Sequence, residues 1–549
     1  MPIQLALASF YTLGILFSFS AAIIFMAMYF LNSINMGMVI LLTIIFNFAV
    51  WMFGPFFTDW IHKIFYHINF FSREQFKAKH QILHDFIEKT TVTNHIDFPK
   101  IGIITDDNPT AYTYGSGAFN ARIVFTTGLF TYLEPNEIEA VIAHEIGHIV
   151  HRDFIVMTVA NTILQLLYEM SEILMKIKTR TNNDKNKKTE ALFFVGLLSY
   201  VFYTIGFYVV LFLSRVRESY ADEFSAQTTK NPHALSNALI KIAYGIVAKA
   251  DDTQSLRLIK STRALSIMGF RTAKGTGLVA QATQMDPAKI AKVMLYDLVS
   301  PWAKLAELNS THPLTGKRLA RLDKLARNLG QKPLFDMPTV YAQNPVDVKK
   351  LWAGFWSGVF INYLPLIAFL STIISIPLAI LFSANNLITI IPLGLGITGL
   401  SVIARAWYKY PPISNARNED VVSLMSDLYT TPVRGKAVAL QGTVIGRGLA
   451  GYVFSEDMMF QDNTGLMYLD YQAGIPLIGN LVFAWKKVKQ LLGQPTSAKG
   501  WFFRSNQQYI ALSSLQYSQS FIRSYAKFWQ MAMGISLLLT SLLLILVLI

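Results

Sequence analysis

The sequence contains no cysteine and few charged residues. Without cysteine, disulfide frameworks, thiolate catalysis and cysteine-ligated zinc sites are excluded, so any metal must be bound by histidine and carboxylate side chains. Charged residues make up 15% of the 549 residues and hydrophobic residues 52%, whereas a typical soluble protein has roughly 25% charged residues. A chain of this composition is not disordered, and it lacks the polar surface to cover one soluble globule. The composition therefore predicts a membrane protein.

The chain carries a formal net charge of +14. Such an excess of Lys and Arg is typical of proteins that bind nucleic acid and of proteins at anionic membranes. A membrane protein collects basic residues in its cytoplasmic loops, which is sufficient to account for the charge. We therefore expect the lipid bilayer, and no nucleic acid, as a partner.

Apolar segments of about 20 residues, the length needed to cross a bilayer, recur along the chain. They predict a multi-pass, mainly α-helical membrane protein with five regions. These regions are a transmembrane hairpin at 1–58, a polar domain at 59–350 that includes membrane helices at 154–173 and 191–213, a second hairpin at 351–407, a smaller polar domain at 408–525 and a final span at 528–549.

The segment 154–173 is the ambiguous span, because four polar or acidic residues interrupt it. They are Asn161, Gln165, Glu169 and Glu172. A helix that turns these residues toward a bundle interior can cross the bilayer. A long helix that lies only partly in lipid fits the sequence equally well.

The segment 144–148, His-Glu-Ile-Gly-His, is the sharpest chemical feature. Pro135 marks a helix start before it, and apolar residues recur through it at helical spacing. Residues four apart share one helix face, so His144 and His148 can offer two imidazoles to one Zn²⁺. Glu145 lies beside them, in position to act as a general base on water. The alternative is an ordinary helix with two partly exposed histidines.

A third metal ligand must be a carboxylate, because the extended motif with a later histidine is missing and Phe154 stands at that place. Glu218 and Asp222 directly follow a predicted span, and their spacing puts both on one helix face. Glu218 can bind the metal while Asp222 accepts the free N–H of a ligand histidine and fixes its tautomer. Without the histidine motif, Glu218 would more often be an ion-pair partner of Arg215 or Arg217.

A second histidine pair, His80 and His84, has the same spacing. Gln81 takes the place of the glutamate, so this pair lacks a base, and no ligand carboxylate follows at a suitable distance. We expect these histidines on an exposed face of a basic helix.

Four motifs between residues 100 and 330 together resemble the HtpX-type membrane proteases and, more distantly, the CAAX prenyl proteases. They are Ala140–His148 followed by Arg152-Asp153, Thr126–Leu129, Ser214–Asp222, and Ser310–Pro313 with Arg318. The resemblance implies a zinc metalloprotease domain of the gluzincin type with a small edge β-sheet and a site that opens at the membrane. It implies one Zn²⁺ per chain, with His144, His148 and Glu218 as ligands and Glu145 as the base.

The same resemblance extends to residues near the substrate. Either His312 or Arg318 can donate to the oxyanion that forms on the scissile carbonyl. Alternatively, Arg318 pairs with a nearby carboxylate and His312 caps a helix. Ala111, Tyr112 and Thr113 correspond to an edge strand that can hold an extended peptide by main-chain hydrogen bonds. The family usually has an asparagine before this alanine, whereas this chain has a threonine.

From residue 433 onward the sequence changes to strand periodicity. Four segments predict strands or hairpins: 438–446, 458–470, 499–504 and 509–512. Residues 477–492 have helical spacing and contain three lysines. This order resembles a small OB-like β-barrel, a fold that can bind single-stranded nucleic acid. Because the barrel lies between spans and its basic helix suits anionic lipid headgroups, we expect a structural or substrate-handling role.

We interpret the chain as a membrane-embedded, zinc-dependent endopeptidase that hydrolyses peptide bonds of membrane or membrane-proximal proteins in quality control. One alternative is a processing protease of a defined substrate, such as a prenylated protein. Another is a non-catalytic membrane scaffold with an OB-like binding domain and a structural zinc site. Glu145 discriminates between enzyme and scaffold, because a structural site has no use for a base.

Basic residues that flank the spans place the active site on the cytoplasmic side of the cell membrane by the positive-inside rule. They are Lys63, Arg73, Lys77, Lys79, Arg215, Arg217, Lys349 and Lys350. The basic run at 176–188 opposes this orientation, because two full crossings at 154–173 and 191–213 would place the run outside.

Overall fold

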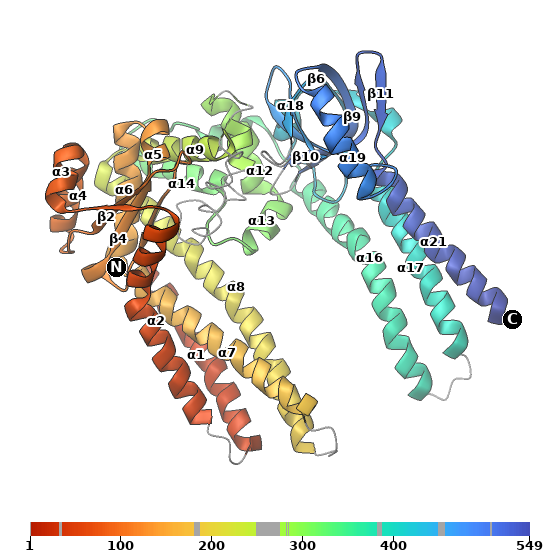
Figure 1. The fold of residues 1–549 in the computed structure, drawn as a ribbon, viewed down its shortest axis with the longest axis horizontal. Coiled ribbons are helices and arrows are strands. Elements are labelled where there is room, and N and C mark those ends of the chain that lie inside the picture. Colours follow the sequence, from red (N-terminus) through yellow and green to blue (C-terminus); the bar gives the residue numbers. More distant parts are fainter. Residues whose placement is uncertain are drawn as a thin grey trace. The chain divides into compact units, whose positions relative to one another are not determined.

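The computed structural model divides into two compact units (Figure 1). The first contains α1 to α9, α14 and strands β1 to β4, and the second contains α12, α15 to α21 and strands β5 to β11. The structure describes residues 2–31, 36–180, 187–248, 275–280, 283, 285–381, 387–447, 456–504 and 508–548.

Seven helices among the described residues are long and apolar enough to cross a membrane, as predicted. They are α1 (Ile3–Leu31), α2 (Met36–Phe65), α7 (Asp153–Arg180), α8 (Lys187–Thr229), α16 (Val348–Leu381), α17 (Leu387–Lys409) and α21 (Ala526–Leu548). The ambiguous segment 154–173 lies in α7 and belongs to this set. Within the basic run, residues 181–186 lie outside the described residues.

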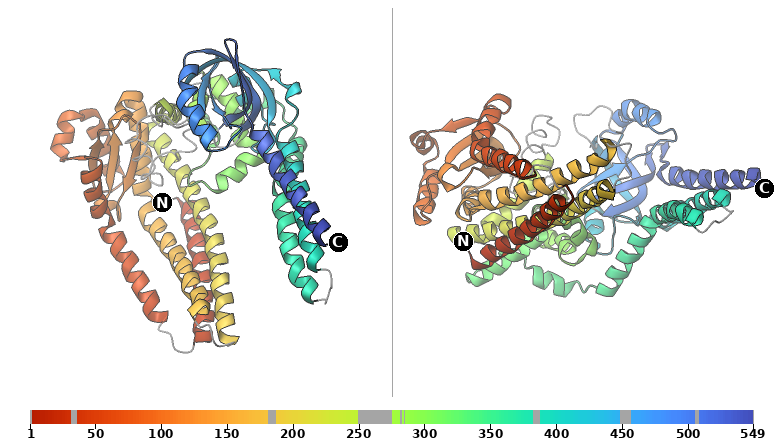
Figure 2. Two further views of the ribbon diagram at one scale, coloured as in Figure 1. Left: turned by 45° about the vertical axis from the view of Figure 1, so that its right-hand side comes forward. Right: turned by 90° about the horizontal axis from the view of Figure 1, so that it is seen from below.

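Helix α8 is the longest of the described helices, with 43 residues. At 1.5 Å per residue it is about 65 Å long, roughly twice the thickness of the hydrocarbon core of a bilayer. The predicted span at 191–213 lies toward its N-terminal end, and Glu218 and Asp222 follow in its C-terminal part. One continuous helix, the long yellow helix in Figure 2, therefore runs from the predicted span to the predicted third ligand.

The first unit contains a small four-stranded sheet with the order β1-β2-β4-β3. Its strands are β1 (Asn69–Phe71), β2 (Lys100–Ile104), β3 (Ala111–Tyr114) and β4 (Arg122–Thr126). β2 and β4 run parallel, and the other neighbours are antiparallel. β3 lies at one edge and pairs only with β4 among the described strands, so the backbone groups of its outer side have no strand partner there.

Within the described part of the first unit, six further helices surround the sheet and the membrane helices. They are α3 (Arg73–Lys79), α4 (Gln81–Thr93), α5 (Thr127–Tyr132), α6 (Pro135–Val150), α9 (Pro232–Ala248) and α14 (Thr315–Asn328). Helix α6 carries the histidine motif and begins at Pro135, whose fixed φ suits the first helical turn. The carboxylate of Glu137 accepts a hydrogen bond from the Glu134 N–H at 2.8 Å and pairs with Lys241 of α9 at 2.8 Å. These contacts fix the start of the helix within the core.

Helices α6 and α8 approach each other closely at Gly147. A Cβ atom at Gly147 would lie 3.2 Å from Cα of Ala221 and 3.3 Å from Cβ of Phe224. A larger side chain would therefore push the two helices apart. The contact brings His148 of α6 and Glu218 of α8 to the same place.

The second unit contains a closed five-stranded barrel in the order β6-β7-β8-β10-β9, in which β9 pairs back with β6. Its strands are β6 (Lys436–Arg447), β7 (Met458–Gln461), β8 (Leu466–Asp470), β9 (Pro495–Arg504) and β10 (Gln508–Tyr517). β8 and β10 are parallel, whereas the other pairs are antiparallel. Helix α19 (Ile478–Lys486) connects β8 to β9. The predicted OB-like barrel is thereby confirmed.

Short elements complete the second unit. They are α12 (Pro287–Val299), α15 (Met337–Gln343), β5 (Arg417–Asn418), α18 (Val421–Ser426), α20 (Val488–Leu491) and β11 (Ser520–Arg523). The chain returns to the first unit at residue 307, within α13 (Pro301–Leu308).

Helix α12 differs from the predicted boundaries, because it lies within 59–350 in sequence but packs with the second unit. Arg504 of β9 donates from Nη2 to the carbonyl of Val293 at 2.8 Å. Its guanidinium carbon also lies 3.9 Å from the centre of the Tyr296 ring. This buried arginine therefore attaches α12 to the barrel. The residues in contact are about two hundred positions apart, so no local sequence pattern predicts the contact.

Candidate active site

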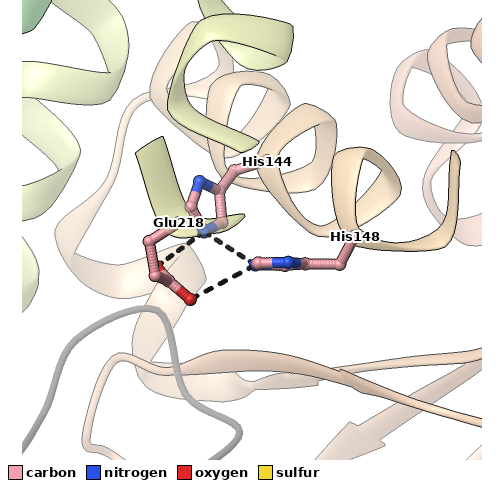
Figure 3. Close-up of side chains that lie close together, drawn as sticks. All are labelled: His144, His148 and Glu218. Atoms are coloured by element: carbon pink, nitrogen blue, oxygen red, sulfur yellow. Dashed lines mark hydrogen bonds and ion pairs between the residues drawn. The ribbon is translucent and has the colours of Figure 1, made fainter. Parts of the chain in front are cut away.

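Three side chains of the first unit converge on one point (Figure 3). His144 and His148 extend from successive turns of α6, and their Nε2 atoms lie 3.2 Å apart. Glu218 of α8 faces both: its Oε2 is 3.6 Å from Nε2 of His144, and its Oε1 is 3.5 Å from Nε2 of His148. The structure thus brings the three predicted ligands together.

The spacing of these atoms fits a tetrahedral metal site. Zinc binds histidine nitrogen and carboxylate oxygen at about 2.0–2.2 Å, which gives a tetrahedron with edges of about 3.3–3.6 Å. The three observed separations, 3.2, 3.5 and 3.6 Å, fall close to that range, although the two histidines face different oxygens of Glu218. Oε2 of Glu218 is buried without a hydrogen-bond partner among the described residues, as expected for an oxygen that serves a metal.

His144 is oriented by a buried carboxylate from α8. Its Nδ1 lies 3.0 Å from Oδ1 of Asp222, the residue predicted to fix its tautomer. Asp222 in turn accepts two hydrogen bonds from Arg318 of α14, at 2.9 Å from Nε and 2.6 Å from Nη2. Arg318 therefore contacts Asp222, which in turn contacts the ring of His144.

His148 has the same arrangement with different residues. Its Nδ1 lies 2.6 Å from Oδ2 of Asp153, at the start of α7. Asp153 is paired with the buried Arg217 of α8, whose Nη2 also donates to Ser9 of α1 at 2.8 Å. The sequence pattern indicates no role for Asp153, although this residue belongs to the Arg152-Asp153 pair that follows the histidine motif. The pattern instead makes Arg217 a possible partner of Glu218.

Glu145 is buried beside the three ligands and is held by the sheet. Thr113 of β3 donates its hydroxyl to Oε2 of Glu145 at 2.5 Å. The other carboxylate oxygen, Oε1, has no hydrogen-bond partner within the described part of the chain. Burial raises the pKa of the Glu145 carboxyl, which moves it toward the range of a general base at neutral pH.

Strand β3 presents alternate side chains to two different places, as a strand must. Thr113 faces Glu145, whereas Tyr114 faces α2 and donates to Oδ1 of Asp59 at 2.7 Å. The hydroxyl of Tyr112 lies 3.3 Å from Nε2 of His62, also on α2. The two tyrosines therefore attach the strand to α2, and Thr113 attaches it to Glu145. The hydroxyl contact of Thr113 is a further site interaction that the sequence pattern did not reveal.

His312 lies on the segment before α14 and points toward the ligands. Its Nε2 is 3.5 Å from Oε1 of Glu218, and its Nδ1 is 2.8 Å from the Thr311 hydroxyl. Burial lowers the pKa of His312, which favours the neutral imidazole with one N–H. The helix that follows has Leu314 at its N-cap, so His312 does not cap it.

The site opens into a cavity of about 450 Å³ within the first unit. Besides Glu145, His148 and Glu218, it is lined by side chains of the membrane helices α7 and α8. These include Phe154, Met157, Thr158, Phe207, Val210 and Leu211. A second, larger cavity of about 750 Å³ between α1, α2 and α7 also includes Thr158 in its lining and is almost wholly apolar.

The second histidine pair lies elsewhere and differs from the prediction of an exposed helix face. His80 stands between α3 and α4, so the two histidines do not share one continuous helix. His84 is buried, because its ring packs on Phe98. His84 lies close to Asp85 and Glu88, and this cluster contains no second histidine.

Residues 74–326 match peptidase family M48. The chain is 26% identical over 332 residues to a protease HtpX homolog of Thermoplasma acidophilum, which covers 59% of this chain and 98% of that protein. It is 28% identical to protease HtpX homolog 2 of Methanosarcina acetivorans, over 45% of this chain and 73% of that one. The crystal structure of Ste24p from S. mikatae is 17% identical, with a TM-score of 0.34 over 59% of this chain and 67% of that chain. The matches in sequence confirm the predicted resemblance.

Replacement of a ligand should abolish metal binding without unfolding the protein. We expect His148→Ala and Glu218→Gln to lower the zinc content from about one ion per chain to near zero, because two remaining ligands bind zinc weakly. Metal is measured by mass spectrometry of purified protein after dialysis. His84→Ala is the matched control, and loss of zinc in this variant instead would contradict the assignment.

Removal of the Thr113 hydroxyl should impair turnover but leave metal binding intact. Thr113→Val deletes the donor to Glu145, so we expect kcat to fall about 10- to 100-fold, the effect of losing a hydrogen bond to a charged group. Thr113→Ser keeps the hydroxyl and should retain most activity. An unchanged kcat in the valine variant would show that the contact does not orient the base.

Proposed function

We propose that this protein, an HtpX-type membrane metalloprotease with an M48 peptidase domain, binds one Zn²⁺ at His144, His148 and Glu218. The observation that carries this assignment is the convergence of these three side chains, whose ligand atoms lie within 4.8 Å of one another, close enough to bind one ion. Zn²⁺ bound there supplies Lewis acidity, which makes water nucleophilic at neutral pH and polarises the scissile carbonyl.

Glu145 acts as the general base and then as the general acid. Its free oxygen accepts a proton from the attacking water and later delivers it to the amine of the leaving product. The Thr113 hydroxyl holds the other oxygen, so the carboxylate keeps one orientation through both transfers. A purely structural metal site would not need this arrangement, which favours the enzyme over the membrane scaffold.

His312 is the donor to the oxyanion in this proposal. When Thr311 donates to Nδ1, the N–H of the neutral imidazole is at Nε2, directed at the site. Arg318 has a positioning role instead, because Nε and Nη2 of its guanidinium are bonded to Asp222. The two residues that sequence reasoning treated as equivalent candidates therefore act at different distances from the substrate.

The substrate binds as an added strand along β3. Ala111, Tyr112 and Thr113 lie at the sheet edge next to Glu145, where no other strand among the described residues pairs with them on the outer side. An extended peptide needs only main-chain hydrogen bonds there, so affinity depends little on its sequence. This suits an enzyme that degrades many polypeptides, as expected in quality control.

Membrane or membrane-proximal proteins are the substrates that the cavity favours. Its walls include residues 154–161 of α7 and 207–214 of α8, which belong to candidate membrane spans. An apolar segment of a substrate can lie against these helices while the adjoining extended segment reaches the base. Processing of a defined prenylated substrate is the second candidate function, because the same apolar walls would accept a lipid chain.

The active site faces the cytoplasm of the cell in this proposal. Lys63, Arg73, Lys77 and Lys79 lie close to the membrane end of α2 in sequence, and the positive-inside rule places such residues in the cytoplasm. The basic run at 176–188 is then an exception on the outer side.

Loss of the base should abolish proteolysis while the metal remains bound. We expect Glu145→Gln to lower the rate of casein or membrane-protein cleavage by about 10²- to 10⁴-fold with unchanged zinc content. A chelator should do the same to the wild type. Glu139→Gln, on the same helix but outside the site, is the control. Equal degradation by wild type and Glu145→Gln would disprove the protease mechanism.

Orientation can be measured with single cysteines, because the chain has none of its own. We expect Lys89→Cys on α4 to react with a membrane-impermeant maleimide only after cells are permeabilised. Asn183→Cys, between α7 and α8 in sequence, should react in intact cells. The reverse pattern would place the active site outside the cytoplasm.

A further inference from the structure

Helix α19 of the barrel domain has an apolar face directed away from the barrel. Phe483 and Ala484 are buried and attach the helix to the domain. The opposite face and the turn before it expose large apolar side chains. They are Ile475, Leu477, Ile478, Leu481, Val482 and Trp485, exposed by 65, 78, 68, 48, 47 and 63%.

This exposure is not the scatter of single apolar residues found on any protein surface. Positions 478, 481, 482 and 485 recur at three and four residues, so they form one continuous stripe on the helix. A contiguous apolar patch of this kind marks a surface that is covered by another molecule or by a membrane.

The charge of the surrounding chain indicates what covers it. Residues 471–549 contain no Asp or Glu, whereas they contain seven Lys and Arg residues. Three of these, Lys486, Lys487 and Lys489, are exposed at the end of α19 and in α20. An apolar stripe with Trp next to clustered lysines is the pattern of helices that lie in the interface of an anionic membrane.

Contacts within the second unit place this helix beside a membrane span. The turn before α19 is bonded to the start of α21: the Tyr525 N–H donates to the carbonyl of Gln472 at 2.8 Å, and Nε1 of Trp529 donates to the carbonyl of Ala473 at 3.1 Å. Exposed aromatic residues, Phe528 and Trp529, lie in the first turn of α21. Such residues mark the level at which a span enters the headgroup region. Figure 1 shows α19 on the side of the barrel from which α21 leaves.

We propose that α19 lies in the plane of the membrane interface, with its apolar stripe among the acyl chains and its lysines on anionic headgroups. The barrel domain then has two attachments to the same leaflet, α21 and α19, so its orientation on the membrane is fixed. This proposal does not depend on the peptidase mechanism.

Spin labels on single cysteines test the proposal in the full-length protein. Ile478→Cys and Leu481→Cys carry the label on the stripe, and Ser423→Cys, beside Asp420 on α18, is the control in water. The protein is placed in nanodiscs of equimolar phosphatidylcholine and phosphatidylglycerol. Collision rates are measured with oxygen, which partitions into lipid, and with the water-soluble nickel complex of ethylenediaminediacetate.

We expect the ratio of oxygen to nickel collisions to be at least about threefold higher at residues 478 and 481 than at residue 423. Combined Lys→Glu substitution at 486, 487 and 489 should lower that ratio, whereas Lys→Arg at the same positions should retain it. A ratio equal to the control overturns the proposal. A high ratio only in discs with two protein copies also overturns it, since a second chain then covers the stripe. Equal ratios in discs of phosphatidylcholine alone overturn the role of anionic lipid.

Discussion

Each of the two histidines at the candidate metal position contacts an aspartate that is paired with a buried arginine. Arg318 pairs with Asp222, which lies 3.0 Å from Nδ1 of His144, and Arg217 pairs with Asp153, which lies 2.6 Å from Nδ1 of His148. An isolated carboxylate at such depth costs several kcal/mol and tends to take up a proton. Each aspartate is paired with an arginine and lies against Nδ1 of one imidazole, so Nε2 of that imidazole faces the candidate metal position. The geometry of the site depends on these two pairs.

The same pairs connect the site with the membrane helices. Arg217 and Asp222 belong to α8, Asp153 begins α7, and the Ser9 hydroxyl that receives Arg217 belongs to α1. Helix α8 is continuous from its predicted membrane span to these residues. A tilt of α8 would therefore move Glu218 together with Arg217 and Asp222. Glu218, Arg217 and Asp153 of the candidate site therefore belong to the same helices that form the predicted membrane spans.

Strand β3 has a comparable double role on the other side of the cavity. Its Thr113 hydroxyl donates to Glu145, its outer edge has no strand partner within the described part of the chain, and its two tyrosines contact α2. One short strand thus links Glu145 with helix α2. In the barrel domain, the turn before α19 is likewise hydrogen-bonded to the start of α21.

The sequence alone determined the features that depend on short spacing and composition. The lack of cysteine required histidine and carboxylate ligands, the four-residue interval put His144 and His148 on one helix face, and apolar length located seven spans. Strand alternation after residue 433 was sufficient to predict the barrel. Only the tertiary structure decided which distant groups meet: Arg217 with Asp153, Arg318 with Asp222, Thr113 with Glu145, and α12 with the second unit. The physical reason is that helical and strand periodicity are local properties of the chain, whereas pairing between buried charges 64 or 96 residues apart depends on how the helices pack.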